Sequence, residues 1–229
     1  MKITKIALFL FFLFSTTATV ANFMNWDGLK LLTKPLIIPA LTFYYLGNIK
    51  KVAFLPALFL FFCFVGDSVA LMDFDHEILY LMGPFFIANI LISIMTWKIR
   101  ERFRWNAFNV FSLALIVAFL LYLWKTVVSF FENDKTNMPL YVGLFGFTLV
   151  VMNVLSAFNI ISRMRLSNLY LALATIAILV SQVFYVIYNY EFKLIVLDTI
   201  HFICQNLSYL FVVLFVIHVP DVKLRIGKL

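Results

Sequence analysis

The chain is a succession of long apolar runs separated by short polar segments. A helix of about 20 apolar residues crosses the roughly 30 Å hydrocarbon core of a bilayer, and eight runs approach or exceed that length. Hydrophobic residues make up 64% of the chain and charged residues 13%, so many side chains must face lipid rather than water. We therefore predict an all-α bundle of eight transmembrane helices that forms a single domain over residues 1–229. The predicted helices are Ile3 to Ala21, Leu29 to Gly47, Val52 to Met72, Ile78 to Trp97, Ala107 to Phe131, Leu140 to Ile161, Leu169 to Tyr188, and Leu194 to Val219.

The first run has a second interpretation. Lys2 and Lys5 precede an apolar stretch, and the small residues Ala18 and Ala21 lie near its end, which is also the pattern of a cleaved signal peptide. The sequence leaves both interpretations open.

The basic residues predict the orientation of the bundle. Alternate ends of the runs place 13 of the 18 basic residues on one side of the membrane. Cytoplasmic loops are rich in Lys and Arg, so we predict that both termini are cytoplasmic. The net charge of +7 then reflects topology, and no nucleic-acid partner is expected. The residues of the basic side are Lys2, Lys5, Lys50, Lys51, Lys98, Arg100, Arg102, Arg104, Arg163, Arg165, Lys223, Arg225 and Lys228.

Polar residues within the runs mark a candidate site, because an ionisable group in a membrane helix is costly unless it is paired or hydrated. At the helical rise, Asp67 lies about 24 Å and Gln182 about 25 Å above the basic side. Asp198 lies about 10 Å below the opposite side, and Lys34 is in the first turns of its run. Four polar groups from four helices therefore converge in the outer half of the membrane.

The last run extends this site. Asp198, His201, Gln205 and Ser208 follow a spacing of i, i+3, i+7 and i+10, which places them on one helical face. Such a face is expected to point into the bundle. Gly66, next to Asp67, would allow another helix to approach closely.

Several polar residues also have plain structural interpretations. Asn89, Asn153, Asn159 and Asn206 are typical of hydrogen bonds between helices, and Lys34 could extend to the outer headgroups. Cys63 and Cys204 are interpreted as small apolar fillers. The sequence has no cysteine–histidine metal pattern and no glycine-rich phosphate loop, so neither a metal nor a cofactor is expected.

An ordered set of short motifs resembles the YhhN family, which includes the lysoplasmalogenases. The resemblance covers about Lys34 to Phe211. The motifs that carry it are Thr33-Lys34-Pro35-Leu36, Phe64-Val65-Gly66-Asp67 with Ala70-Leu71, Gly83-Pro84-Phe85-Phe86, Pro139 with Tyr141 and Met152, Ser181-Gln182, and His201-Phe202-Ile203-Cys204-Gln205.

The resemblance implies an eight-helix membrane enzyme that hydrolyses the vinyl-ether bond of a lysophospholipid, giving a fatty aldehyde and a glycerophospho-base. Asp67 corresponds to one acid of the family's proposed active site. The chain departs from the family at Gln182, where the family often has a second acid, and at Asn89, where it often has His.

These observations give a mechanistic hypothesis in which carboxylates of the third and eighth helices meet in one pocket. Asp67 would donate a proton to the vinyl ether, and Asp198 with His201 would stabilise the cation or orient water. Lys34 would hold the lipid phosphate or pair with Asp67, and Gln182, Gln205 and Asn89 would contact the substrate. The expected location is the bacterial inner (cell) membrane, and the expected partner is a lysophospholipid or a related lipid.

Two alternatives remain at this stage. The departures at Gln182 and Asn89 favour a family member that binds or senses a lipid without catalysis. A small-molecule or proton-coupled transporter would also use buried Asp and His. The sequence does not predict an oligomeric state.

Overall fold

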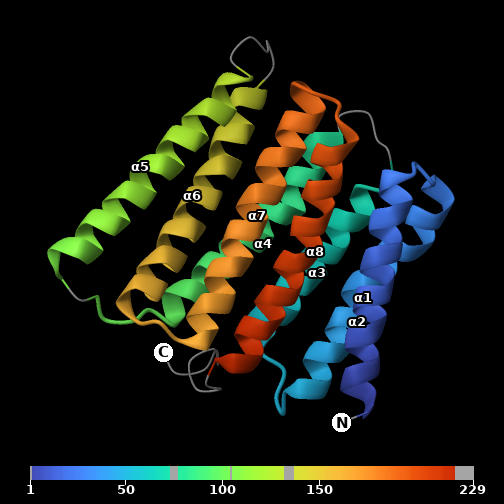
Figure 1. Ribbon diagram of the computed structural model, residues 1–229, viewed down its shortest axis with the longest axis horizontal. Helices are drawn as coiled ribbons and strands as arrows, with labels where there is room; N and C mark the ends of the chain where they lie inside the picture. Colours follow the sequence, from blue (N-terminus) through green and yellow to red (C-terminus); the bar gives the residue numbers. More distant parts are fainter. Residues whose placement is uncertain (1, 73–76, 104, 132–136, 220–229) are drawn as a thin grey trace.

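The computed structural model describes residues 2–72, 77–103, 105–131 and 137–219, and these residues form eight α-helices with no strand among them (Figure 1). The predicted number of helices is confirmed. Four of the basic residues used to predict orientation, Arg104, Lys223, Arg225 and Lys228, lie outside the described residues. The helices are α1 (Lys2–Phe23), α2 (Asp27–Asn48), α3 (Phe54–Val69), α4 (Glu77–Lys98), α5 (Ala107–Ser129), α6 (Met138–Ser162), α7 (Leu166–Tyr190) and α8 (Ile195–His218).

Six of the described helices are long and apolar enough to cross a membrane, which is the pattern of a multi-pass membrane protein. The two others differ for physical reasons. Charged residues and two prolines lower the hydropathy of α2, and α3 has 16 residues, about 24 Å of helix. The third helix ends at Val69 rather than at the predicted Met72, because residues 70–72 form a turn. A crossing by all eight helices, and the cytoplasmic placement of the termini, stay predictions.

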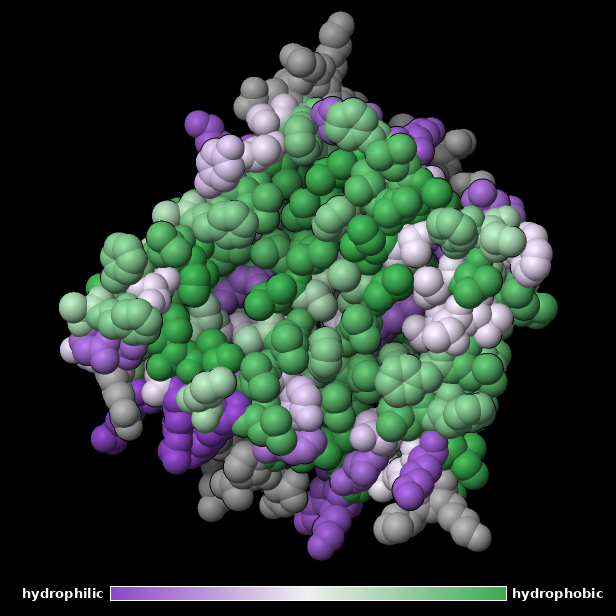
Figure 2. Space-filling model, viewed as in Figure 1, coloured by the Kyte–Doolittle hydropathy of each residue, from purple (hydrophilic) through white to green (hydrophobic). Residues whose placement is uncertain are grey.

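The outer surface of the bundle is apolar. Green hydrophobic side chains form a broad band across the molecule in Figure 2, and hydrophilic ones gather mainly along its upper and lower margins. Helix α5 shows the pattern most clearly, because Phe108, Phe111 and Tyr122 are each at least 68% exposed and Leu120 is its buried residue. A surface of this kind is stable in lipid and unstable in water.

The eight helices are arranged as packed neighbours along the bundle. The pairs α1–α2, α3–α4, α5–α6 and α7–α8 are in contact, α4 packs on α6, and α2 and α1 pack on α8 (Figure 1). The start of α1 and the end of α8 lie on the same side. We call this side, which carries the α2–α3, α4–α5 and α6–α7 loops, the basic end, and the opposite side the cavity end.

Two local features shape the cavity end. Asn25, in the turn between α1 and α2, has φ 55°, a left-handed conformation that Asn tolerates better than most residues. Helix α2 then contains Pro35 and Pro39. Each proline lacks the N–H that would bond to the carbonyl four residues earlier, so α2 is held in the bundle by its neighbours rather than by an unbroken ladder.

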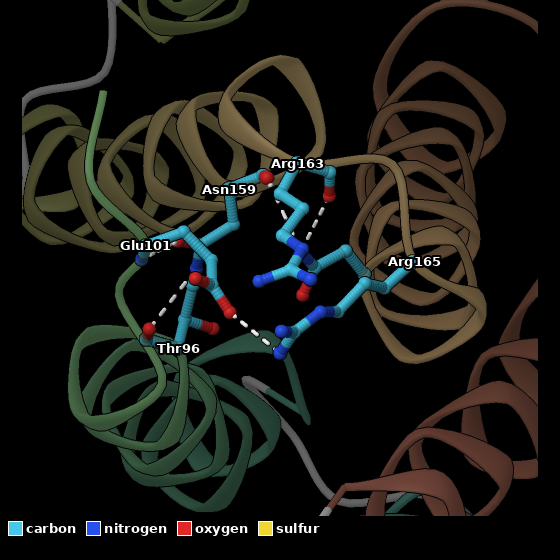
Figure 3. A network of polar contacts seen from close by, with 6 residues as sticks. Thr96, Glu101, Asn159, Arg163 and Arg165 are labelled. Carbon is cyan, nitrogen blue, oxygen red and sulfur yellow. Dashed lines mark hydrogen bonds and ion pairs between the residues drawn. The ribbon is translucent and has the colours of Figure 1, made fainter. Parts of the chain in front are cut away.

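Side chains and loop backbone bond together at the basic end (Figure 3). The Asn159 amide donates to the Thr96 carbonyl at 3.1 Å and accepts from the Glu101 N–H at 3.2 Å. Asn168 donates to two carbonyls of the α6–α7 region, and Arg165 pairs with Glu101 at 2.9 Å. We call these residues the basic-end network. They join the ends of α4, α6 and α7, which confirms the predicted interhelical bonding of Asn159.

Candidate functional site

A polar cavity of about 480 Å³ opens at the cavity end. It lies between the α1–α2 turn, α2, α8 and the outer ends of α3, α4 and α7. Both signs of charge are present on its wall, which is unusual within an apolar bundle. The polar residues that line it are Asn22, Asn25, Asp27, Lys30, Lys34, Tyr185, Tyr188, Asn189, Asp198, His201 and Gln205.

Asp67 lies one layer behind this wall and is 3% exposed. The Gln205 side-chain amide donates to Asp67 Oδ1 at 2.9 Å, and Lys34 Nζ lies 3.9 Å from the same oxygen. Lys34 and Gln205 both line the cavity, so they separate the carboxylate from it. The Gln205 amide also donates to the Tyr209 hydroxyl at 2.7 Å, which fixes its orientation.

The Lys34 side chain has a second partner. Its ammonium lies 5.3 Å from the centre of the Phe202 ring, a favourable position for a cation over an aromatic face. Lys34 is 7% exposed and points into the bundle. The interpretation of Lys34 as a residue that extends to the outer headgroups is therefore wrong, because an acid and an aromatic ring hold it inside.

Gly66 has the role that its position predicted. A Cβ atom at this residue would lie 2.8 Å from Phe85 Cζ, so the absence of a side chain lets the α4 ring rest on α3. Phe85 also lines the polar cavity.

The predicted polar face of α8 points inward. Asp198 accepts a hydrogen bond from the Asn22 amide at 2.6 Å, which joins α1 to α8. His201 Nδ1 lies 2.8 Å from the Ser181 hydroxyl and 2.9 Å from the Ser181 carbonyl oxygen. The Tyr185 ring packs on the imidazole with centroids 5.0 Å apart. These contacts fix Asp198 and His201 in the cavity wall.

The two carboxylates do not meet as the sequence hypothesis proposed. Asp198 lines the cavity, whereas Asp67 contacts Lys34 and Gln205 behind it. The reason is that Gln205, two helical turns after Asp198, takes the position on α8 that faces Asp67. Asp198 and the two partners of Asp67, Lys34 and Gln205, therefore line the same cavity, although the two acids are not in contact.

Two predicted residues lie elsewhere. Gln182 lines a separate apolar cavity between α4, α5, α6 and α7. Asn89 is 3% exposed, does not line the polar cavity, and its amide nitrogen has no hydrogen-bond partner in the described part of the chain. The depth of Gln182 along its helix does not determine which side of the helix the residue faces.

Asn153 and Asn206 were also predicted to form hydrogen bonds between helices. Asn153 donates to the Leu149 carbonyl of its own helix rather than to a neighbour, and the Asn206 amide nitrogen has no partner among the described residues. The interhelical prediction is therefore wrong for Asn153, whose amide reaches the carbonyl four residues earlier.

Several residues of the site were missed by sequence reasoning. Tyr209 lies four residues after Gln205, so the same helical face contained the signal for it. Asp27 and Lys30 belong to the start of α2, a run in which Lys34 was the one predicted site residue. No spacing pointed to Asn22, because its partnership with Asp198 depends on how α1 packs.

The described residues contain no group of three or more His, Cys, Asp or Glu side chains that could hold a metal ion. Both lysines of the cavity wall and Asp27 lie on α2, and Asp198 lies on α8. Two lysines on one wall can bind an anion such as a phosphate group through charge-assisted hydrogen bonds.

The profile of the YhhN family matches residues 29–212. The chain belongs to the YhhN family. The match includes Lys34, Asp67, Asp198, His201, Gln205 and Tyr209. Comparison with curated proteins and with solved structures gave no match.

Proposed function

We propose that this YhhN protein is a membrane hydrolase that cleaves the vinyl-ether bond of a lysophospholipid. One observation carries the proposal. A buried carboxylate, Asp67, is held by Lys34 and Gln205, and both of these side chains face a polar cavity. The side chains of Lys34 and Gln205 thus lie between this acid and a cavity that a lipid headgroup could enter.

The charges of the wall suggest how the lipid is oriented. Lys30 and Lys34 lie on one face of α2 and would bind the phosphate. A lysophospholipid keeps its headgroup hydrated and its chain in the bilayer, so a cavity at one end of the bundle suits it. When Lys34 turns toward the phosphate, the Asp67 carboxyl becomes accessible from the cavity.

The chemistry then needs one proton and one water molecule. Asp67, in its protonated form, transfers a proton to the vinyl carbon that is not bonded to oxygen, and an oxocarbenium ion forms at the other carbon. Asp198 stabilises this cation and, with His201, orients a water molecule that adds to the charged carbon. One proton of the added water then passes to the Asp67 carboxylate, which regains its acid form, and a hemiacetal remains. The proton of the hemiacetal hydroxyl moves to the glycerol oxygen as the carbon–oxygen bond to glycerol breaks, which releases an aldehyde and a glycerophospho-base with a free hydroxyl.

A second candidate function is lipid binding without catalysis. It is favoured by the position of Asp67 behind the wall and by Gln182, which cannot ionise and lines a different cavity. Both candidates use the same phosphate contacts, so they differ only in whether aldehyde is released.

The test is aldehyde release from a lysoplasmalogen by the purified full-length protein in detergent. Asp67→Asn is expected to reduce release at least about 100-fold, the usual contribution of a positioned acid. The matched control is Asp27→Asn, which changes an exposed aspartate of the same cavity and is expected to retain activity.

The folded state of each variant is checked by size-exclusion chromatography and circular dichroism. Unchanged release by folded Asp67→Asn would remove this residue from the mechanism. Lysolipid binding by the wild-type protein without any aldehyde would instead support the second candidate.

A further inference from the structure

A second cavity lies next to the polar one and has a different character. It is a narrow space of about 60 Å³ between α4, α5, α6 and α7. Its wall is mainly aliphatic and aromatic, and includes Leu120, Phe145, Leu149, Val150 and Leu179. We call it the apolar cavity.

The two cavities share part of their walls. Leu81, Phe85 and Tyr185 line both of them. Tyr185 packs against His201 on the polar side, and Phe85 rests on Gly66 beside Asp67. A molecule that extended past these side chains would therefore have one end among charges and the other among hydrocarbon groups.

The shape and chemistry of the apolar cavity restrict its occupant. Its narrow space suits a single hydrocarbon chain and excludes a hydrated headgroup. The Trp124 indole N–H, which forms part of the wall, donates to the Gly143 carbonyl at 2.9 Å, so it does not offer a free donor to a polar ligand. A chain that leaves the bilayer or a micelle is already in hydrocarbon, so van der Waals packing against the cavity wall, rather than removal from water, would favour its binding here.

We propose that the apolar cavity binds the hydrocarbon chain of the same single-chain lipid whose headgroup occupies the polar cavity. This inference rests on the proposed function for the identity of the lipid. It assigns substrate selection by chain to α4–α7, and headgroup recognition to α2 and α8. It also gives Gln182 a place beside the chain rather than beside the reacting bond.

Trp124 provides a direct probe of occupancy. The test uses full-length protein in which Trp26, Trp97 and Trp105 are replaced by Phe, because none of these three lines either cavity. Bromine quenches indole fluorescence on contact. Lysophosphatidylcholine with a dibrominated chain, titrated in detergent, is expected to quench Trp124 and to saturate.

Two adjacent valines supply the matched variants. Val150 lines the apolar cavity, whereas Val151 lines a groove on another side of α6. Val150→Phe is expected to weaken the saturable quenching about tenfold, because its ring occupies space that the chain would fill and overpacks the cavity when the chain is bound. Val151→Phe is expected to leave it unchanged. Glycerophosphocholine, which has no chain, should compete equally well against both variants.

Leu179→Phe fills the same cavity from α7 and serves if Val150→Phe does not fold. Equal quenching in the Val150 and Val151 variants, or quenching that rises without saturation, would overturn the inference. The same samples are assayed for aldehyde. If aldehyde is released but Val150→Phe does not weaken the quenching, only the chain site is rejected. If Val150→Phe weakens the saturable quenching but no aldehyde is released, only the hydrolase function is rejected.

Discussion

The basic-end network and the polar cavity are both groups of polar side chains inside an apolar bundle, but they are built differently. In the basic-end network, the amides of Asn159 and Asn168 bond mainly to backbone atoms of loops and helix ends. At the cavity end, the side chains of Lys34 and Gln205 each contact the Asp67 carboxylate, and both of them line the polar cavity.

This difference separates residues that stabilise the fold from residues to which the proposed function assigns lipid binding. Backbone carbonyls at a helix end need partners in any folded state, and the basic-end network supplies them. The cavity end instead concentrates charges whose burial is costly and whose partners can exchange with a ligand. Substitutions should therefore affect folding at one end, and both folding and lipid recognition at the other.

The largest effect is expected from Lys34→Met. This change leaves the Asp67 carboxylate buried without a cation, which should lower the free energy of unfolding by about 3–5 kcal/mol. Adding Asp67→Asn should recover most of the loss, because a neutral amide can still bond to Gln205. The free energies of unfolding of the wild type, the two single variants and the double variant are measured by equilibrium unfolding in mixed micelles. Additive losses in the double variant would show that the two residues are not a functional pair.

A smaller effect is expected from Asn159→Leu at the basic end. The Thr96 carbonyl and the Glu101 N–H lose their partner, at a cost of about 2 kcal/mol in the free energy of unfolding. Asn153→Leu is the control, because Asn153 bonds only within α6 and should matter less. Aldehyde release per folded molecule should match the wild type. A selective loss of release would contradict the separation of the two ends.

The smallest effect is expected from Arg165→Met. Its side chain is 34% exposed, and ion pairs of this kind contribute at most about 1 kcal/mol. Any difference in unfolding free energy between this variant and the wild type should shrink further at high salt, where exposed charges are screened. A large, salt-independent loss would show that the Arg165–Glu101 pair is an essential part of the network.

The sequence predicted the helices well because their signal is local. Apolar length gave eight helices, and the spacing of Asp198, His201 and Gln205 gave a face of α8 that points inward. The site was predicted less completely. Lys34 pairs with Asp67, which is one of the two roles expected for it, whereas Asp198 does not meet Asp67, and Gln182 and Asn89 lie elsewhere.

Hydrophobicity along the chain determined by itself that this protein is an α-helical bundle, because a backbone in lipid must satisfy its own hydrogen bonds. Short local motifs also predicted the family, whose profile matches residues 29–212. Only the tertiary structure decided that Asp67 lies behind Lys34 and Gln205, that Asn22 holds Asp198, and that Gln182 faces a second cavity. Those facts depend on the rotation of each helix about its axis, which neighbouring side chains set through packing and which no spacing within one helix encodes.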